Sequence, residues 1–257
     1  MPLTLRQVCF VAEKIQPVID DLKAVLGLEV CYKDPNVVIF GLENALLPVG
    51  TNFIEVVSPV QEKTAAERYL QRRGGDGGYM ILAQVDSSEE HAALRARAEK
   101  MGVRVAWETV YETVHFMQLH PLDTGGTFFQ IDWDTENDHQ GHWVPANGKG
   151  WKEFVRTGVV SEIRAAELQS SDPATLAGRW SSLADIPLQK DRNGNPEMQL
   201  KNVVIRFVKD IDGRGEGLGA IDIKVTDRKK LLKEAEDRQL RISDAQVVIC
   251  GVRINLI

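Results

Sequence analysis

The stretch HPLDTGGTFFQIDW, residues 120–133, contains the start of a strand with two unlike faces. Pro121 and the paired glycines interrupt the chain, and an alternating run follows them. Successive side chains of a strand point to opposite sides, so Phe128, Gln130 and Asp132 share one face and the residues between them share the other. One face is therefore apolar enough to pack on a core, and the other is polar enough to carry chemistry.

Strands of this kind surround four helices that the sequence marks by caps and by an apolar period of 3.6 residues. The helices are expected within residues 16–27, 87–102, 172–185 and 226–240. Each helix follows one alternating run and precedes further strand-like runs, and GLEV at 27–30 is echoed by GVRV at 102–105. The order strand, helix, strand, strand, strand thus repeats four times, with loops of unequal length.

Two domains are the simplest division of such a chain, since domains usually hold about 100–150 residues. The segment NDHQGHWVPANGKGW, residues 137–151, is rich in Gly and Asn and has no periodicity. We therefore predict a first domain over residues 1–135, a linker over 136–157 and a second domain over 158–257. His139 and His142 lie in this linker, where we expect them to be solvated.

The composition argues against several classes of function. The 257 residues include 31 Lys and Arg against 37 Asp and Glu, a net charge of −6, and no basic stripe indicates a nucleic-acid partner. No apolar run approaches the roughly 20 residues of a membrane span, and the N-terminus lacks a secretory signal, so we expect a cytoplasmic protein that does not bind membranes. The three cysteines lie in apolar runs and indicate reduced thiols. We expect a monomer or homodimer whose partner is a small molecule.

The repeat, LGLEV at 26–30 and LHPLDTGGTFFQID at 119–132 together resemble the vicinal oxygen chelate superfamily of glyoxalases, methylmalonyl-CoA epimerases, extradiol dioxygenases and antibiotic-resistance proteins. The resemblance covers essentially the whole chain and is clearest over residues 3–133. It implies an α+β fold in which four βαβββ modules pair into two glyoxalase/dioxygenase-like domains with cupped mixed sheets. It also implies metal ligands on the first and last strands of each module. The fold alone does not imply a reaction, because this superfold carries several chemistries.

Four residues match the ligand positions of the first domain, namely Gln7, Glu55, Met80 and Gln130. Gln7 and Glu55 fit the family pattern. The Met80 thioether is a poor ligand for hard or borderline divalent ions, and Gln130 supplies an oxygen without charge. The resemblance therefore implies a metal set of Gln7, Glu55 and Gln130 that binds a divalent ion (Zn, Ni, Co, Mn, Fe or Mg) weakly, or a cup without any cofactor.

Glu55 is the first choice for a catalytic residue, because an acid between apolar Phe53 and Val57 needs either a partner or a task. The alternative is a structural network in which Gln7 and Gln130 bond each other or Glu55. His115 is a second possible base, since it shares a face with Met117 and Leu119 that we expect to reach the cup, although a satisfied strand histidine is the alternative. Alternation points Tyr79 toward the helix side, whereas an irregular start of the strand would reverse this orientation. The side chains expected to contact substrate are Cys9, Phe53, Met80, Leu82 and Phe128.

The second domain differs, because its matching positions Ala165, Arg206, Ala220 and Asn255 cannot form the family's metal site. Alternation turns a charged set toward that cup, consisting of Glu167, Arg206, Asp222, Arg253 and Asn255. This set either forms an internal salt-bridge network or receives an anionic group of a substrate. We favour the network, since no nucleophile accompanies the charges.

Three functions follow. The leading hypothesis is an enzyme that acts on a small oxygen-rich organic molecule in the first cup, by lyase, isomerase (epimerase) or dioxygenase chemistry. The first alternative is a non-catalytic small-molecule-binding protein with a degenerate metal site. The second alternative is a metal-free isomerase or lyase in which Glu55 or His115 is the base. The sequence does not identify the substrate.

Overall fold

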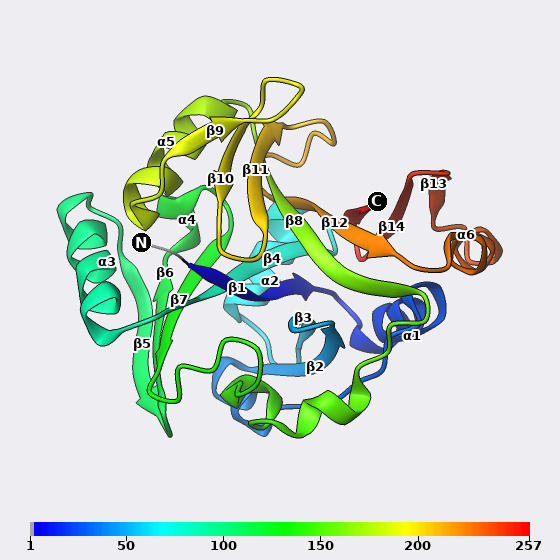
Figure 1. The fold of residues 1–257 in the computed structure, drawn as a ribbon, viewed down its shortest axis with the longest axis horizontal. Coiled ribbons are helices and arrows are strands. Elements are labelled where there is room, and N and C mark those ends of the chain that lie inside the picture. Colours follow the sequence, from blue (N-terminus) through cyan, green and yellow to red (C-terminus); the bar gives the residue numbers. More distant parts are fainter. Residues whose placement is uncertain (1–2) are drawn as a thin grey trace.

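The computed structural model describes residues 3–257, which form two mixed β-sheets with helices at their sides (Figure 1). The first sheet has seven strands in the order β2-β3-β1-β4-β7-β6-β5, and the second has eight in the order β13-β14-β15-β12-β8-β11-β10-β9. The elements of the first sheet's half are β1 (Thr4–Val11), α1 (Ile15–Leu26), the 3-10 helix η1 (Pro35–Phe40), β2 (Leu42–Val49), β3 (Asn52–Pro59), α2 (Ala65–Arg73), β4 (Gly77–Val85), α3 (Ser88–Lys100), β5 (Val105–Tyr111), β6 (Val114–Leu119), α4 (Pro121–Thr124) and β7 (Phe128–Asp134). The remaining elements are η2 (Val144–Ala146), η3 (Gly150–Phe154), β8 (Val160–Ser170), α5 (Pro173–Ala184), β9 (Leu188–Lys190), β10 (Pro196–Gln199), β11 (Val204–Lys209), β12 (Gly217–Val225), α6 (Arg228–Asp237), β13 (Arg241–Ser243), β14 (Gln246–Ile249) and β15 (Val252–Leu256).

The strand pairing confirms the four-unit repeat and the α+β fold. The opening strands of two units lie antiparallel at the centre of each sheet, β1 beside β4 and β8 beside β12. The last strand of each unit returns parallel to its own opening strand, as β3 does to β1 and β7 to β4. The first unit is one strand short, since the segment before η1 makes only an isolated bridge between Tyr32 and Leu46.

All four predicted helices are present, as α1, α3, α5 and α6. The predicted cap of α3 is confirmed, because Ser87 Oγ accepts a hydrogen bond from the Glu90 backbone N–H at 3.3 Å. Sequence reasoning missed α2, which begins with the same kind of cap: Thr64 Oγ1 accepts from the backbone N–H of Glu67 at 3.0 Å. This Thr-x-x-Glu signal was present in the sequence and marks a helix start.

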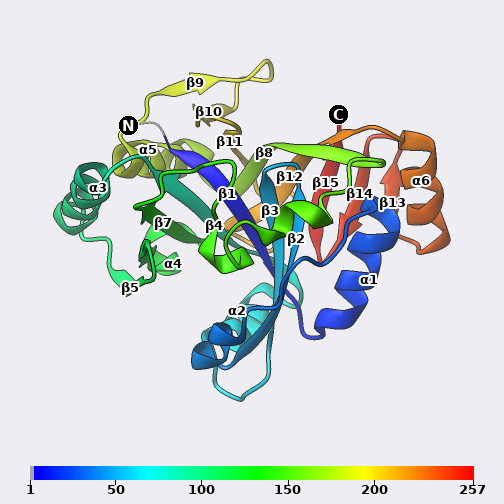
Figure 2. The same ribbon diagram turned by 60° about the horizontal axis from the view of Figure 1, so that its bottom comes forward.

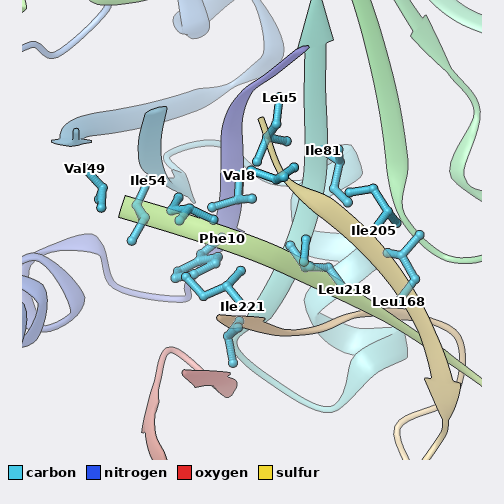
Figure 3. Close-up of a cluster of buried hydrophobic side chains, with 14 of the residues drawn as sticks. Leu5, Val8, Phe10, Val49, Ile54, Ile81, Leu168, Ile205, Leu218 and Ile221 are labelled. Carbon is cyan, nitrogen blue, oxygen red and sulfur yellow. The ribbon is translucent and has the colours of Figure 1, made fainter. Parts of the chain in front are cut away.

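One apolar core joins the two sheets. Figure 3 shows Val8, Phe10 and Ile81 of the first sheet facing Leu168 and Ile221 of the second. The helices flank this layer, with α1 against α6 on one side and α3 against α5 on the other (Figure 2). Because burying this shared apolar surface stabilises both sheets together, the division into two separate domains stays a prediction.

The face of the first sheet that points away from this core is concave and carries a second apolar cluster, which includes Cys9, Phe53 and Met80. Residues 136–157, predicted as a linker, fold back across this face and bury Trp143 and Trp151 in the cluster. They therefore form part of a wall rather than a bare connection. No helix within residues 3–257 is both long and apolar enough to cross a bilayer.

Candidate active site

A cavity of about 600 Å³ opens in the concave face of the first sheet. It is lined by Gln7, Tyr32, Asp34, Asn36, Val37, Ile39, Phe40, Leu42, Asn44, Glu55, Val57, Tyr79, Met80, Leu82, Trp107, Thr109, Val110, Tyr111, Glu112, Phe116, Gln118, Gln130, Val144, Pro145, Asn147 and Gly148. The rings of Phe40 and Trp107 meet edge-on at 5.2 Å. Since η1 packs on β2 and Trp107 lies on β5, this contact connects the two opposite edges of the sheet and closes the cup.

Glu55 lies at the base of the cavity and is 8% exposed. One carboxylate oxygen accepts a hydrogen bond from Gln7 Nε2 and the other from Asn44 Nδ2, each at 2.7 Å. Burial raises the pKa of Glu55, and the two amide donors oppose this shift. The carboxyl group is thus fixed in orientation and brought closer to the pH range in which a carboxylic acid exchanges protons effectively.

Two further donors fix the orientation of these amides. Gln7 Oε1 accepts from the indole N–H of Trp143 at 2.9 Å. Asn44 Oδ1 accepts from the backbone N–H of Asp34 at 2.8 Å. Each amide therefore has its oxygen turned away from Glu55, toward its own donor, and its NH₂ group turned toward Glu55. The folded-back segment and the chain before η1 together determine how the acid is held.

The structure brings only part of the predicted contact set to the cavity. Met80 and Leu82 line it. Cys9 and Phe53 are fully buried beneath the surface, and burial followed by the nearby Glu55 raises the pKa of the Cys9 thiol well above its usual value. Phe128 does not line the cavity and packs edge-on against Tyr79 at 5.1 Å. Cys9, Phe53 and Phe128 therefore support the wall of the cavity and would not contact a ligand inside it.

Tyr79 departs from the prediction that it would face the helices. In the pairing of β1 with β4, Cys9 is opposite Met80 and Phe10 is opposite Gly78, so Tyr79 is an extra residue in β4. Such a bulge breaks the alternation of side chains. Tyr79 and Met80 consequently both line the cavity.

Gln130 lines the cavity but does not bond Glu55. Its oxygen accepts from Gln118 Nε2 at 2.7 Å, and its Nε2 donates to Asp132 Oδ2 at 2.8 Å. Asp132 is fully buried, and this burial raises the pKa of its carboxyl group well above the usual value. The expected single network of glutamines and Glu55 is therefore two networks on different walls.

The structure does not bring His115 to the cavity. Phe116 and Gln118 occupy the cavity side of β6, while Met117 and Leu119 belong to the core between the sheets. His115 shares their side of the strand, where its ring lies 4.6 Å from that of Trp133. The expectation that it reaches the cup was wrong, because alternation groups residues by face but does not tell which face is turned to the core.

The two linker histidines are paired, contrary to the expectation of solvated side chains. His142 Nδ1 lies 2.7 Å from Asp134 Oδ2, and His139 Nε2 lies 3.0 Å from Asp86 Oδ1. Both contacts join the folded-back segment to strands or turns of the first sheet's half. The histidines therefore hold the wall in place.

The side chains expected to bind a metal do not fit a divalent ion. Both oxygens of Glu55 and the oxygen of Gln7 already accept hydrogen bonds from N–H groups, and Gln130 belongs to the other network. Met80 adds only a soft thioether. Within residues 3–257, no three His, Cys, Asp or Glu side chains gather in an arrangement that could hold a metal ion. This donor set does not support a metal-assisted reaction.

The charged cup of the second sheet is an internal network, as predicted. Arg206 contacts Glu167 at 2.6 Å and Asp222 at 3.0 Å, and Asn255 donates to Asp222 at 2.8 Å. Arg253 lies 3.8 Å from Glu167. The charges of this set therefore pair mainly with one another, although Arg206 Nε and Arg253 Nη2 are buried without a hydrogen-bond partner in the described part of the chain.

Sequence reasoning missed Asn44 and Asp34, which line the cavity, and Trp143, which holds Gln7 from behind it. Asn44 had a signal, since it is an amide inside the apolar run LENALLPV and alternates with Leu42 and Leu46. Asp34 and Trp143 had none, because both lie in irregular segments whose position depends on long-range packing.

The chain resembles known proteins both in sequence and in fold. A family model described as a glyoxalase-like domain matches residues 8–184. The crystal structure of a hypothetical protein from Staphylococcus aureus has a similar fold, with a TM-score of 0.64 and 15% identity over 100% of this chain and 99% of that chain. A methylmalonyl-CoA epimerase in complex with methylmalonyl-CoA and NH₄⁺ aligns with 52% of this chain and 96% of its own, at 18% identity and a TM-score of 0.45. No curated protein matches the sequence.

Proposed function

Because the chain belongs to the family of glyoxalase-like domains, as its resemblance to the vicinal oxygen chelate superfamily predicted, we propose that it is a metal-independent isomerase or lyase. Its substrate is a small carbonyl compound bound in the cavity of the first sheet, and Glu55 is the base. One observation carries the proposal: a buried carboxyl group with a raised pKa stands at the base of a large cavity, held by two amides.

The reaction needs only groups that the chain supplies. Ionised Glu55 removes a proton from a carbon next to the carbonyl, and the electron pair moves onto the carbonyl oxygen. The proton then returns from Glu55 to the same or a neighbouring carbon in an isomerase, whereas a leaving group departs from the adjacent carbon in a lyase. Gln118 also lines the cavity, and its amide has a second N–H besides the one that bonds Gln130. That N–H is suited to stabilise the developing enolate oxygen.

The test is hydrogen exchange between D₂O and small carbonyl compounds, followed by NMR. A panel of ketones, hydroxyketones and aminoketones is incubated with wild-type protein and with Glu55→Gln, both treated with a chelator. We expect exchange that survives the chelator and falls by about two orders of magnitude or more in Glu55→Gln. Glu43→Gln, which neutralises an exposed carboxylate on β2, is the matched control and should exchange like the wild type.

Two results would contradict the proposal. Exchange that persists in folded Glu55→Gln would remove Glu55 from the role of base. Exchange that disappears with the chelator and returns with a divalent ion would show that a metal carries the reaction.

A second candidate function is the non-catalytic binding of a small molecule. It is favoured by the same hydrogen bonds, because both oxygens of Glu55 are already engaged by Gln7 and Asn44. Binding of panel compounds without any wild-type exchange, and with similar affinity in Glu55→Gln, would favour this second function.

A further inference from the structure

The charges around the cavity are all of one sign. Within residues 3–257, no lysine, arginine or histidine lines it, whereas three carboxylic acids do: Asp34, Glu55 and Glu112. Arg6, the neighbour of Gln7 in the chain, is turned away and donates to the backbone oxygens of Asp138 and His142. A ligand in this cavity therefore meets negative charge without any compensating positive side chain.

Two of these acids, Asp34 and Glu112, are more exposed than Glu55 and therefore lie nearer the mouth, although they come from different parts of the first sheet's half. Asp34 precedes η1, and Glu112 lies in the turn between β5 and β6. The pKa of Tyr32 is raised by partial burial and then by Asp34, Tyr111 and Glu112, so all of these groups lie within electrostatic reach of one ring. The backbone N–H of Asp34 also bonds Asn44, which in turn holds Glu55. The mouth and the base of the cavity are thus directly linked.

Aromatic rings line the same cavity as the acids. The set consists of Tyr32, Phe40, Tyr79, Trp107, Tyr111 and Phe116. The face of an aromatic ring carries partial negative charge and attracts a cation, most strongly when water is excluded. Rings of this kind beside two carboxylates form a site that favours a positively charged organic group and disfavours an anion.

We propose that the substrate carries a cationic group, an amine or a quaternary ammonium, that is held between Asp34, Glu112 and the aromatic rings at the mouth. The uncharged carbonyl part extends toward Glu55 at the base. The orientation toward Glu55 rests on the proposed function, whereas the preference for a cation rests on the lining alone. Carboxylate- or phosphate-bearing compounds are expected to bind poorly, because no side chain of the cavity neutralises them.

The preference is tested with three probes of one ring size and different charge: benzyltrimethylammonium, benzyl alcohol and benzoate. Isothermal titration calorimetry measures their affinities for the full chain at low and at high salt. We expect the cation to bind about tenfold or more tighter than the anion, a difference of about 1.4 kcal/mol. The difference should shrink at high salt, because part of it comes from exposed charge.

The variant Asp34→Asn/Glu112→Gln removes both charges at the mouth and should abolish the preference for the cation. The asparagine keeps the side-chain oxygen that caps η1, so the fold is preserved. Glu112→Gln alone, at an exposed turn position, should lose part of the preference, and Glu43→Gln should keep all of it. Benzoate binding as tightly as the cation, or an unchanged preference in the double variant, would overturn the proposal.

Glu55→Gln separates this inference from the proposed function. If the proton transfer is wrong and the charge preference is right, this variant changes neither exchange nor the order of the three probes. If only the charge preference is wrong, exchange is lost in the variant while the wild type binds benzoate as well as benzyltrimethylammonium.

Discussion

Glu55 is the point where two chains of hydrogen-bond donors meet, which makes a rescue experiment possible. On one side Trp143 donates to Gln7 and Gln7 donates to Glu55, at 2.9 and 2.7 Å. On the other side the Asp34 backbone donates to Asn44 and Asn44 donates to Glu55, at 2.8 and 2.7 Å. A carboxylate accepts from both sides, whereas an amide at position 55 would turn its own NH₂ toward a donor.

Glu55→Gln should therefore destabilise the fold, since a buried donor without an acceptor costs about 1–3 kcal/mol. Neither neighbouring amide can turn over without meeting the donor behind it. Asn44→Asp should cost about as much at mildly alkaline pH, because two buried carboxylates would then meet. The double variant Glu55→Gln/Asn44→Asp moves the carboxylate from position 55 to position 44, its neighbour in the series of hydrogen bonds. There it accepts from the amide at position 55 and from the Asp34 backbone N–H.

Urea denaturation of the four proteins measures the effect. We expect each single variant to lose about 1–3 kcal/mol of unfolding free energy and the double variant to lie within about 1 kcal/mol of the wild type. The two substitutions should therefore be coupled by at least about 1 kcal/mol. Proton exchange should remain absent in the double variant, because its carboxylate has left position 55. Losses that add to within about 0.5 kcal/mol would refute the inferred order of donors and acceptors.

Three further predictions concern the surrounding networks. Asp132→Asn should become more stable relative to the wild type as the pH rises. Burial raises the pKa of Asp132, so the wild type has its full stability below the ordinary pKa of 3.8 and loses stability as the pH rises toward the folded pKa. Denaturation at several pH values measures the difference between the two proteins, and a difference that does not change with pH would contradict the prediction. Gln130→Glu should place a second carboxylate against Asp132 and lower the unfolding free energy by about 2 kcal/mol near neutral pH. Calorimetry should show unchanged binding of divalent ions, whereas a gain of tenfold or more in Mn²⁺ affinity would restore the metal hypothesis. Trp143→Phe should lower the unfolding free energy by about 1–3 kcal/mol, because it leaves the Gln7 oxygen buried without its donor and shortens the ring that Arg6 covers at 4.6 Å. Chemical denaturation measures this loss, and a loss below about 0.5 kcal/mol would show that the indole does not support the site.

The sequence by itself determined the local features of this protein. The family resemblance implied that Gln7 and Glu55 face one cup, as they do. Helix caps and apolar periods predicted the four long helices, and alternation grouped the side chains within each strand by face. These features depend on residues a few positions apart, so a single sequence carries them. The prediction of the βαβββ units rested on the same short-range patterns.

Only the tertiary structure decided which residues surround Glu55 and which do not. The bulge at Tyr79 turned an expected core residue into the cavity, and the packing of β6 against the shared core turned His115 out of it. Trp143 reaches Gln7 across 136 positions of the chain. Such contacts form because two sheets bury one apolar layer and bring irregular segments over the opposite face, and the free energy of that burial depends on the whole fold rather than on any local pattern.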